Sequence, residues 1–120
     1  MRNSPQDVHK KAFGRQGERL AAAYLKGLGY RILKTNYKTT YGGADSVALD
    51  GQAVVFGEVK ARLSGAYGTP AEAVEAHKRR RYADIARWFI MKAGCEPYIR
   101  FDVVEVSERG VNHIPAAFEP

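Results

Sequence analysis

The sequence predicts an α/β domain with a central mixed β-sheet flanked by helices, its elements following in the order αβββαββ. Two stretches with apolar residues at helical spacing, residues 9–28 and 69–93, predict the helices. Short runs rich in β-branched and aromatic residues predict the strands. One predicted hairpin carries small or apolar side chains on both of its faces, which is typical of a sheet covered on both sides.

The first predicted helix follows a flexible, polar N-terminal segment, residues 1–8, and covers residues 9–28. Gly14 and Gly17 weaken its first half, since glycine in a helix lowers stability. Two glycines one turn apart next to an acid indicate close approach of another backbone or a ligand. Glu18 is therefore either a third acid directed at a site on the sheet or a surface carboxylate paired with a neighbouring arginine.

The first strand is expected over residues 30–37, and a hairpin formed by the next two strands follows it. An Asp-Gly pair at positions 50–51 is a strong signal for a two-residue turn between those strands. In the tight register that we expect, Asp45 faces Phe56 and is the diagonal neighbour of Glu58, with Cα atoms roughly 7–8 Å apart. The hairpin would thus bring two carboxylates within reach of one cation.

Lys60 lies on the same strand face as Glu58, because side chains alternate along a strand. Two carboxylates with nothing positive between them repel, and a hard cation such as Mg²⁺ or Mn²⁺ resolves that repulsion. Lys60 would then act as a point charge that stabilises negative charge developing on a phosphate. Judged by local spacing alone, the alternative is an edge hairpin on which Glu58 and Lys60 form a solvated pair with no task.

A glycine-containing loop, residues 61–69, follows Lys60 and leads into the second helix. Thr69 as N-cap and Pro70 at the first helical position indicate where this helix begins, and Gly94 is expected to end it. Two further strands are expected over residues 98–106 and 110–118.

Composition limits the protein class. With 120 residues, 45% of them hydrophobic, the chain predicts a single domain over residues 9–120. No apolar run long enough to span a membrane and no export signal is expected, and the single Cys95 excludes an internal disulfide. Together these favour a cytoplasmic protein. Three scattered histidines without zinc-ligand spacing give no indication of a zinc site.

Nineteen Lys and Arg against thirteen Asp and Glu give a net charge of +6, which favours a polyanionic partner, nucleic acid first, although many basic proteins bind nothing in particular. Lys78, Arg79 and Arg80 begin a basic run on the second helix. At about 100° per residue they cannot all face one phosphate backbone. Together with Arg62 they are candidates for phosphate contacts, with a solvated, ion-paired surface as the alternative.

Several motifs occur in a fixed order along the chain: Gly-Arg-Gln-Gly-Glu ending at Glu18, an Asp at position 45, Val-Phe-Gly-Glu-Val-Lys ending at Lys60, and Arg-Phe-Asp-Val-Val from Arg100. In this combination the chain resembles the uncharacterised bacterial YraN family over residues 14–118. That family is similar to the archaeal Holliday-junction resolvases and to the restriction-endonuclease-like superfamily, whose members use a PD-(D/E)xK site.

The resemblance implies a restriction-endonuclease-like fold and an endonuclease that depends on Mg²⁺ or Mn²⁺ and hydrolyses structured or branched DNA. By the same resemblance Asp45 and Glu58 would be the metal ligands, helped by the carbonyl of Val59. Lys60 would be the catalytic lysine, and Glu18 an acid supplied by the first helix.

Two positions depart from the family pattern. The usual Glu of a Glu-Ile-Asp sequence is replaced by Gly43, and Ser46 stands where an aliphatic residue is expected. In the expected register Gly43 lies opposite Glu58, so a further metal contact would be lost there. The alternative function is a catalytically weak or inactive nuclease-fold module that binds nucleic acid or a protein partner, and a third is a basic structural protein. The sequence leaves a monomer and a homodimer open.

Overall fold

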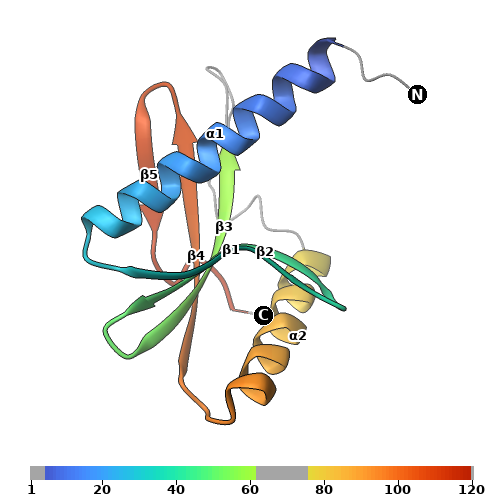
Figure 1. Cartoon of the computed structure of the whole chain (residues 1–120), viewed down its shortest axis with the longest axis vertical. Helices are drawn as coiled ribbons and strands as arrows, with labels where there is room; N and C mark the ends of the chain where they lie inside the picture. Colours follow the sequence, from blue (N-terminus) through green and yellow to red (C-terminus); the bar gives the residue numbers. More distant parts are fainter. Residues whose placement is uncertain (1–4, 62–75, 120) are drawn as a thin grey trace.

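The computed structural model describes residues 5–61 and 76–119, with side chains from residue 14 onward. Two helices, α1 (Pro5–Gly27) and α2 (Ala76–Ala93), accompany one five-stranded sheet (Figure 1). Its strands are β1 (Arg31–Thr39), β2 (Gly42–Asp50), β3 (Ala53–Ala61), β4 (Tyr98–Ser107) and β5 (Gly110–Ile114). They lie in the order β1-β2-β3-β4-β5, with β3 and β4 parallel and the other neighbours antiparallel. The predicted mixed α/β architecture is confirmed.

Helix α1 begins at Pro5, earlier than the predicted start at His9. Proline suits the first turn of a helix, because its missing N–H has no partner there and its φ is already helical. Residues 5–8, which we expected to be flexible, are therefore helical. At the other end the helix stops at Gly27, and Gly29 has a φ of 93°, a conformation that residues with a side chain rarely adopt.

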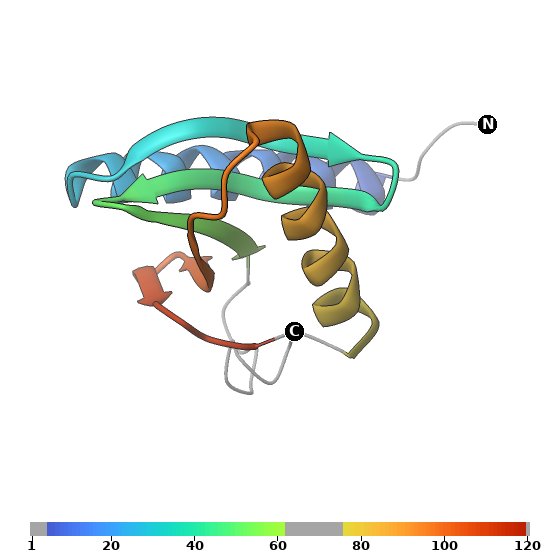
Figure 2. The same cartoon turned by 90° about the horizontal axis from the view of Figure 1, so that it is seen from below.

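The two helices cover different faces of the sheet, as predicted (Figures 1 and 2). Helix α2 packs through Tyr82 and Ile85 on a cluster that includes the fully buried Phe56. Helix α1 packs through Leu25 on a smaller cluster that includes Val104. Polar groups on the sheet must therefore be satisfied within the protein or at its open ends.

Helix α2 connects the parallel strands β3 and β4, as such a pair requires. It ends at Gly94, which has a φ of 72°, so this prediction is confirmed. The predicted helix start at Thr69 and Pro70 lies outside the described residues. Neither described helix is long and apolar enough to cross a membrane.

The register of the β2–β3 hairpin differs from the predicted one. Phe56 pairs with Val47, so the predicted pairing of Phe56 with Asp45 is wrong, as is that of Glu58 with Gly43. The described pairing ends at Ser46 with Gly57, so neither Asp45 nor Gly43 is paired with Glu58. Asp45 instead lies where the ladder ends, and its side chain binds the backbone N–H of Val59, the residue after Glu58.

The position of the turn explains this shift. Asp50 pairs with Ala53 and stays in the ladder, so the turn consists of Gly51 and Gln52. The carboxylate of Asp50 is fixed by an ion pair of 2.8 Å with Arg100 of β4. Gly51, with a φ of 59°, supplies the positive φ that a tight hairpin turn needs at its first central position.

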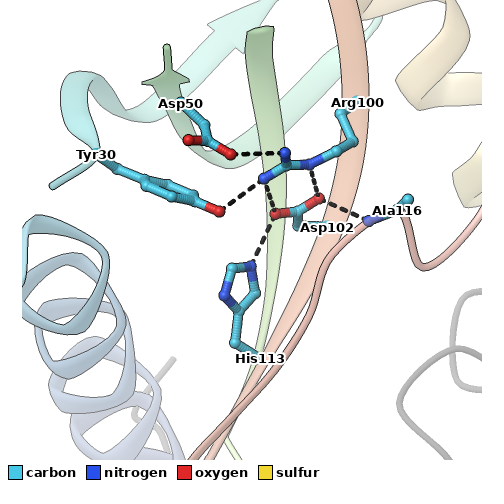
Figure 3. A network of polar contacts seen from close by, with 6 residues as sticks. All are labelled: Tyr30, Asp50, Arg100, Asp102, His113 and Ala116. Atoms are coloured by element: carbon cyan, nitrogen blue, oxygen red, sulfur yellow. Dashed lines mark hydrogen bonds and ion pairs between the residues drawn. The ribbon is translucent and has the colours of Figure 1, made fainter. Parts of the chain in front are cut away.

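A buried polar network joins β4 to the C-terminal residues (Figure 3). Asp102 is 1% exposed and accepts hydrogen bonds from Arg100 Nε at 2.9 Å, His113 Nε2 at 2.8 Å and the Ala116 N–H at 2.9 Å. Arg100 Nη2 also donates to the hydroxyl of Tyr30 at 2.8 Å. Burial alone would raise the pKa of Asp102, but the bonds from His113 and Arg100 outweigh it and hold that pKa below its ordinary value. The carboxylate therefore remains charged and ties β4 to the residues around it.

Candidate active site at the end of the β2–β3 hairpin

The last β2–β3 pair in the described strands is Ser46 with Gly57. Just beyond it, Asp45 Oδ2 accepts the backbone N–H of Val59 at 2.7 Å. A side chain thus takes the place that a strand carbonyl would have in a continued ladder. Burial raises the pKa of Asp45 to about 6; the Val59 hydrogen bond opposes the shift and the negative charge of Glu58 adds to it.

Glu58 is directed toward α2 and is 6% exposed. The hydroxyl of Tyr82 donates to its Oε2 at 2.6 Å, and Lys78 Nζ lies 3.1 Å from its Oε1. Burial alone would raise the pKa of Glu58, but the Tyr82 and Lys78 contacts outweigh it and hold that pKa below its ordinary value. The carboxylate is therefore ionised at neutral pH although it is almost completely buried.

Lys60 lies on the same side of β3 as Glu58, with Nζ 3.6 Å from Oε1. Its side chain is 19% exposed and that of Glu58 8%, so the alternative of a solvated pair on an edge hairpin is excluded. Removal from water lowers the pKa of Lys60, and the neighbouring Lys78 lowers it further. Glu58 thus carries one negative charge between two ammonium groups.

A cleft of about 290 Å³ opens on the other side of Asp45, between α1 and strands β1 to β3. We call it the α1 cleft; its lining includes Arg15, Glu18, Arg19, Asn36, Asp45 and Ser46. Glu18 is half-buried in this lining, and its charge contributes to the raised pKa of Asp45. The structure therefore brings Glu18 and Asp45 to one cleft, while Glu58 is bonded to α2 on the opposite face.

Gly17 explains how α1 comes so close to the sheet. A Cβ at this position would lie 2.9 Å from the Cβ of Ala61 on β3, closer than such atoms normally come. At Gly14 the same atom would meet nothing within 4 Å. The predicted close approach of a second backbone is thus confirmed at Gly17 alone, directly before Glu18.

The predicted nucleic-acid contacts are distributed unevenly. Arg62 lies outside the described residues, and Arg79 and Arg80 are respectively half-buried and exposed on α2. Lys78, predicted as a phosphate contact, forms an ion pair with Glu58, and 27% of its side chain is exposed. The sequence did not identify Tyr82 as a member of the site, because its helical spacing is that of a core residue and does not show what its hydroxyl contacts.

The donor set fits a hydrated divalent cation better than a fully enclosed one. Among the described residues no three His, Cys, Asp or Glu side chains gather into a metal-binding group. Asp45 and Glu58 still have acceptor capacity, because two carboxylate oxygens offer about four lone-pair sites. Mg²⁺ takes one or two protein carboxylates and keeps several waters. Asp45 can therefore be the main ligand, with Glu58 in support.

A model of the uncharacterised protein family UPF0102, the YraN family, matches residues 17–106. The chain belongs to this family. A UPF0102 protein of Anaeromyxobacter dehalogenans is 47% identical over 115 residues, covering 92% of this chain and 86% of its own length. One of Geobacter metallireducens is 40% identical over 117 residues, covering 93% and 96% respectively. The matched span contains Glu18, Asp45, Glu58 and Lys60. The predicted resemblance is confirmed, and the names of these UPF0102 relatives state no activity.

Proposed function

We propose that this UPF0102 protein is a divalent-metal-dependent endonuclease that hydrolyses phosphodiester bonds of structured or branched DNA. The observation that carries the proposal is the opening of the β2–β3 ladder at Asp45, which binds the Val59 N–H beside Glu58, together with the contact between Lys60 and Glu58. A five-stranded mixed sheet with a helix on each face is compatible with a restriction-endonuclease-like fold. The Arg and Lys excess of the chain supports a polyanionic substrate.

Each residue has a distinct task in this proposal. Asp45 would hold Mg²⁺ or Mn²⁺, with Glu58 and the carbonyl of Val59 in support, and the bound ion would supply an activated water and Lewis-acid stabilisation. Lys60 would stabilise negative charge that develops on the phosphate, since its ammonium is already fixed by Glu58. Tyr82 would hold the orientation of Glu58 through its 2.6 Å hydrogen bond.

A second candidate is a module that binds nucleic acid or a protein partner without cutting. It is favoured by the contacts of Lys78 and Tyr82, which satisfy the Glu58 carboxylate without a metal. We expected the replacement of the family's usual Glu by Gly43 to favour this module through the loss of a contact at Glu58, and the observed pairing of Gly43 does not support that reason. Gly43 pairs with Lys38 of β1 and does not face Glu58.

A cleavage panel separates the two candidates. Single-stranded, duplex, flapped and four-way DNA would be incubated with Mg²⁺ or Mn²⁺ and wild type, Asp45→Asn or Lys60→Ala protein. We expect cleavage of a branched substrate that Asp45→Asn abolishes and Lys60→Ala lowers by roughly 10², with DNA affinity retained. Asp84→Asn is the matched control, because Asp84 lies on the surface of α2 and is ion-paired to Arg87.

The same panel contains the contrary results. Wild-type protein that binds DNA but cuts no substrate with either metal supports the binding module. Wild-type protein that neither cuts nor binds DNA or RNA at low salt overturns both candidates and leaves a protein partner.

A further inference from the structure

We propose that the α1 cleft is a subsite for one nucleotide of a single strand beside the cleaved bond, with Arg15 at its rim and Ser46 at its floor as binding residues. The identity of the ligand rests on the proposed function. Three separate features of the cleft support a ligand there: an unpaired buried hydroxyl, cations around an acidic interior, and a strand residue with a positive φ.

Ser46 supplies the hydroxyl. The residue is 6% exposed, and its Oγ has no hydrogen-bond partner in the described structure. It occupies the space opposite Gly57, where a Cβ would collide with the Oγ. A buried hydroxyl without a partner lowers stability, so a native protein that keeps one is expected to use it. A ligand in the cleft would provide the missing partner.

The charges in the cleft are arranged in layers. Arg15 and Arg19 are exposed and one helical turn apart, whereas Glu18 and Asp45 are half-buried. A phosphate would be repelled by the inner acids and attracted by the outer guanidinium groups, which bind phosphate oxygens in a bidentate manner. We therefore place the nucleotide phosphate at the rim, beside Arg15.

Asn36 lies on the facing wall, on β1, with a φ of 50°. Asparagine adopts this conformation more readily than most residues with a side chain, and residues in it are concentrated at binding and catalytic sites. The side-chain amide offers both donors and an acceptor, which is what a base edge requires. A volume of about 290 Å³ is at the lower end of the range for small-ligand pockets, so one nucleotide fits and a duplex does not.

Binding would be measured by fluorescence anisotropy with a labelled oligothymidylate in EDTA, so that neither metal nor cleavage contributes. Arg15→Gln should reduce the slope of log affinity against log salt by about 0.7, the value for one phosphate contact on a single strand. Ser46→Ala should weaken binding by about fivefold, the equivalent of one net hydrogen bond, without lowering the melting temperature. Arg31→Gln is the matched control. Arg31 is exposed at the start of β1 and pairs with Leu49, whose side chain packs on the α2 side.

Each contrary result has a separate meaning. Equal effects of Arg15→Gln and Arg31→Gln overturn the subsite, because only total charge would then matter. A lower melting temperature with unchanged affinity for Ser46→Ala makes that hydroxyl structural and also overturns it. If the wild type cuts DNA but Arg15→Gln leaves the DNA affinity and its salt dependence unchanged, the subsite proposal is wrong and the nuclease proposal stands. If binding depends on Arg15 but the protein cuts no substrate with either metal, the subsite proposal stands and the nuclease proposal is wrong.

Discussion

Replacing Tyr82 by Phe removes one hydroxyl from the most buried contact of the candidate site. The hydroxyl lies 2.6 Å from Glu58 Oε2, and Tyr82 is 0% exposed. Phe retains the ring, which meets Phe101 and Phe118 edge-on at centroid distances of 6.1 and 5.5 Å. The apolar packing is therefore kept, and the substitution removes only the polar contacts of the hydroxyl, of which the bond to the carboxylate is the shortest.

The expected loss depends on pH. A hydrogen bond to a charged group contributes about 1.5–3 kcal/mol, and Glu58 is too buried for water to replace the donor, so we expect about 2–3 kcal/mol at pH 7. The pKa of Glu58 is held below its ordinary value of 4.5, with Tyr82 as a major cause. A depressed carboxyl pKa stabilises the fold above the unfolded pKa, and this stabilisation is lost as the pH falls through the folded pKa. The loss caused by Tyr82→Phe should therefore shrink below about pH 4.5.

Urea unfolding of wild type, Tyr82→Phe, Glu58→Gln and the double variant at pH 7 and pH 4 would measure this. Tyr82→Phe should cost under about 1 kcal/mol in the Glu58→Gln background, because the charged acceptor is gone. Tyr98→Phe, at an exposed position, is the matched control and should change little. An equal loss at both pH values and in both backgrounds would refute the reasoning and assign the effect to packing.

Three further expectations concern the acids. The pKa of Asp45 is about 6 without metal, so below pH 6 cation binding must displace a proton. The Mn²⁺ affinity measured by calorimetry should therefore rise about tenfold per pH unit up to pH 6 and stay constant above it. An affinity that does not change with pH would contradict Asp45 as a ligand. Lys78→Gln removes a cation that competes for Glu58 and should raise Mn²⁺ affinity severalfold, whereas a fall shows that Lys78 positions Glu58. Asp102→Asn breaks the buried pair with Arg100 and should cost about 3–5 kcal/mol in urea unfolding; a loss under about 1 kcal/mol contradicts the network as a stabilising element.

Periodicity was sufficient to predict that these helices and strands occur, because each buries one or two apolar faces on the same sheet. It did not give their ends: the last strand stops at Ile114, not at residue 118. Gly94 could be predicted as a helix end for a local reason, its positive φ. The close packing at Gly17 was also predicted, because a glycine inside an amphipathic helix indicates close approach of another segment, although the same signal at Gly14 has no neighbour within 4 Å. These are properties of a residue and its immediate neighbours along the chain.

Contacts between segments that are distant along the chain could not be predicted from such local patterns. The hairpin register depends on Asp50, which stays in the ladder and is bound by Arg100, 50 residues away. The position of the Tyr82 hydroxyl beside Glu58, 24 residues away, depends on how α2 packs after the crossover. Neither an Asp-Gly pair nor a helical spacing contains this information, so the predicted register was wrong and Tyr82 was not predicted as a member of the site.

The charges of the two carboxylates are compensated to different degrees, and this difference determines where a cation would be stabilised most. At Glu58 two ammonium groups and a hydroxyl already compensate the charge, and the pKa is depressed. At Asp45 burial and the charges of Glu58 and Glu18 outweigh the hydrogen bond from Val59, and the pKa is raised. Neighbouring groups whose pKa values are shifted apart are typical of acids with different tasks. A divalent ion would therefore relieve repulsion most at Asp45, beside Glu18 in the α1 cleft, while Glu58 would support the ion and also hold Lys60.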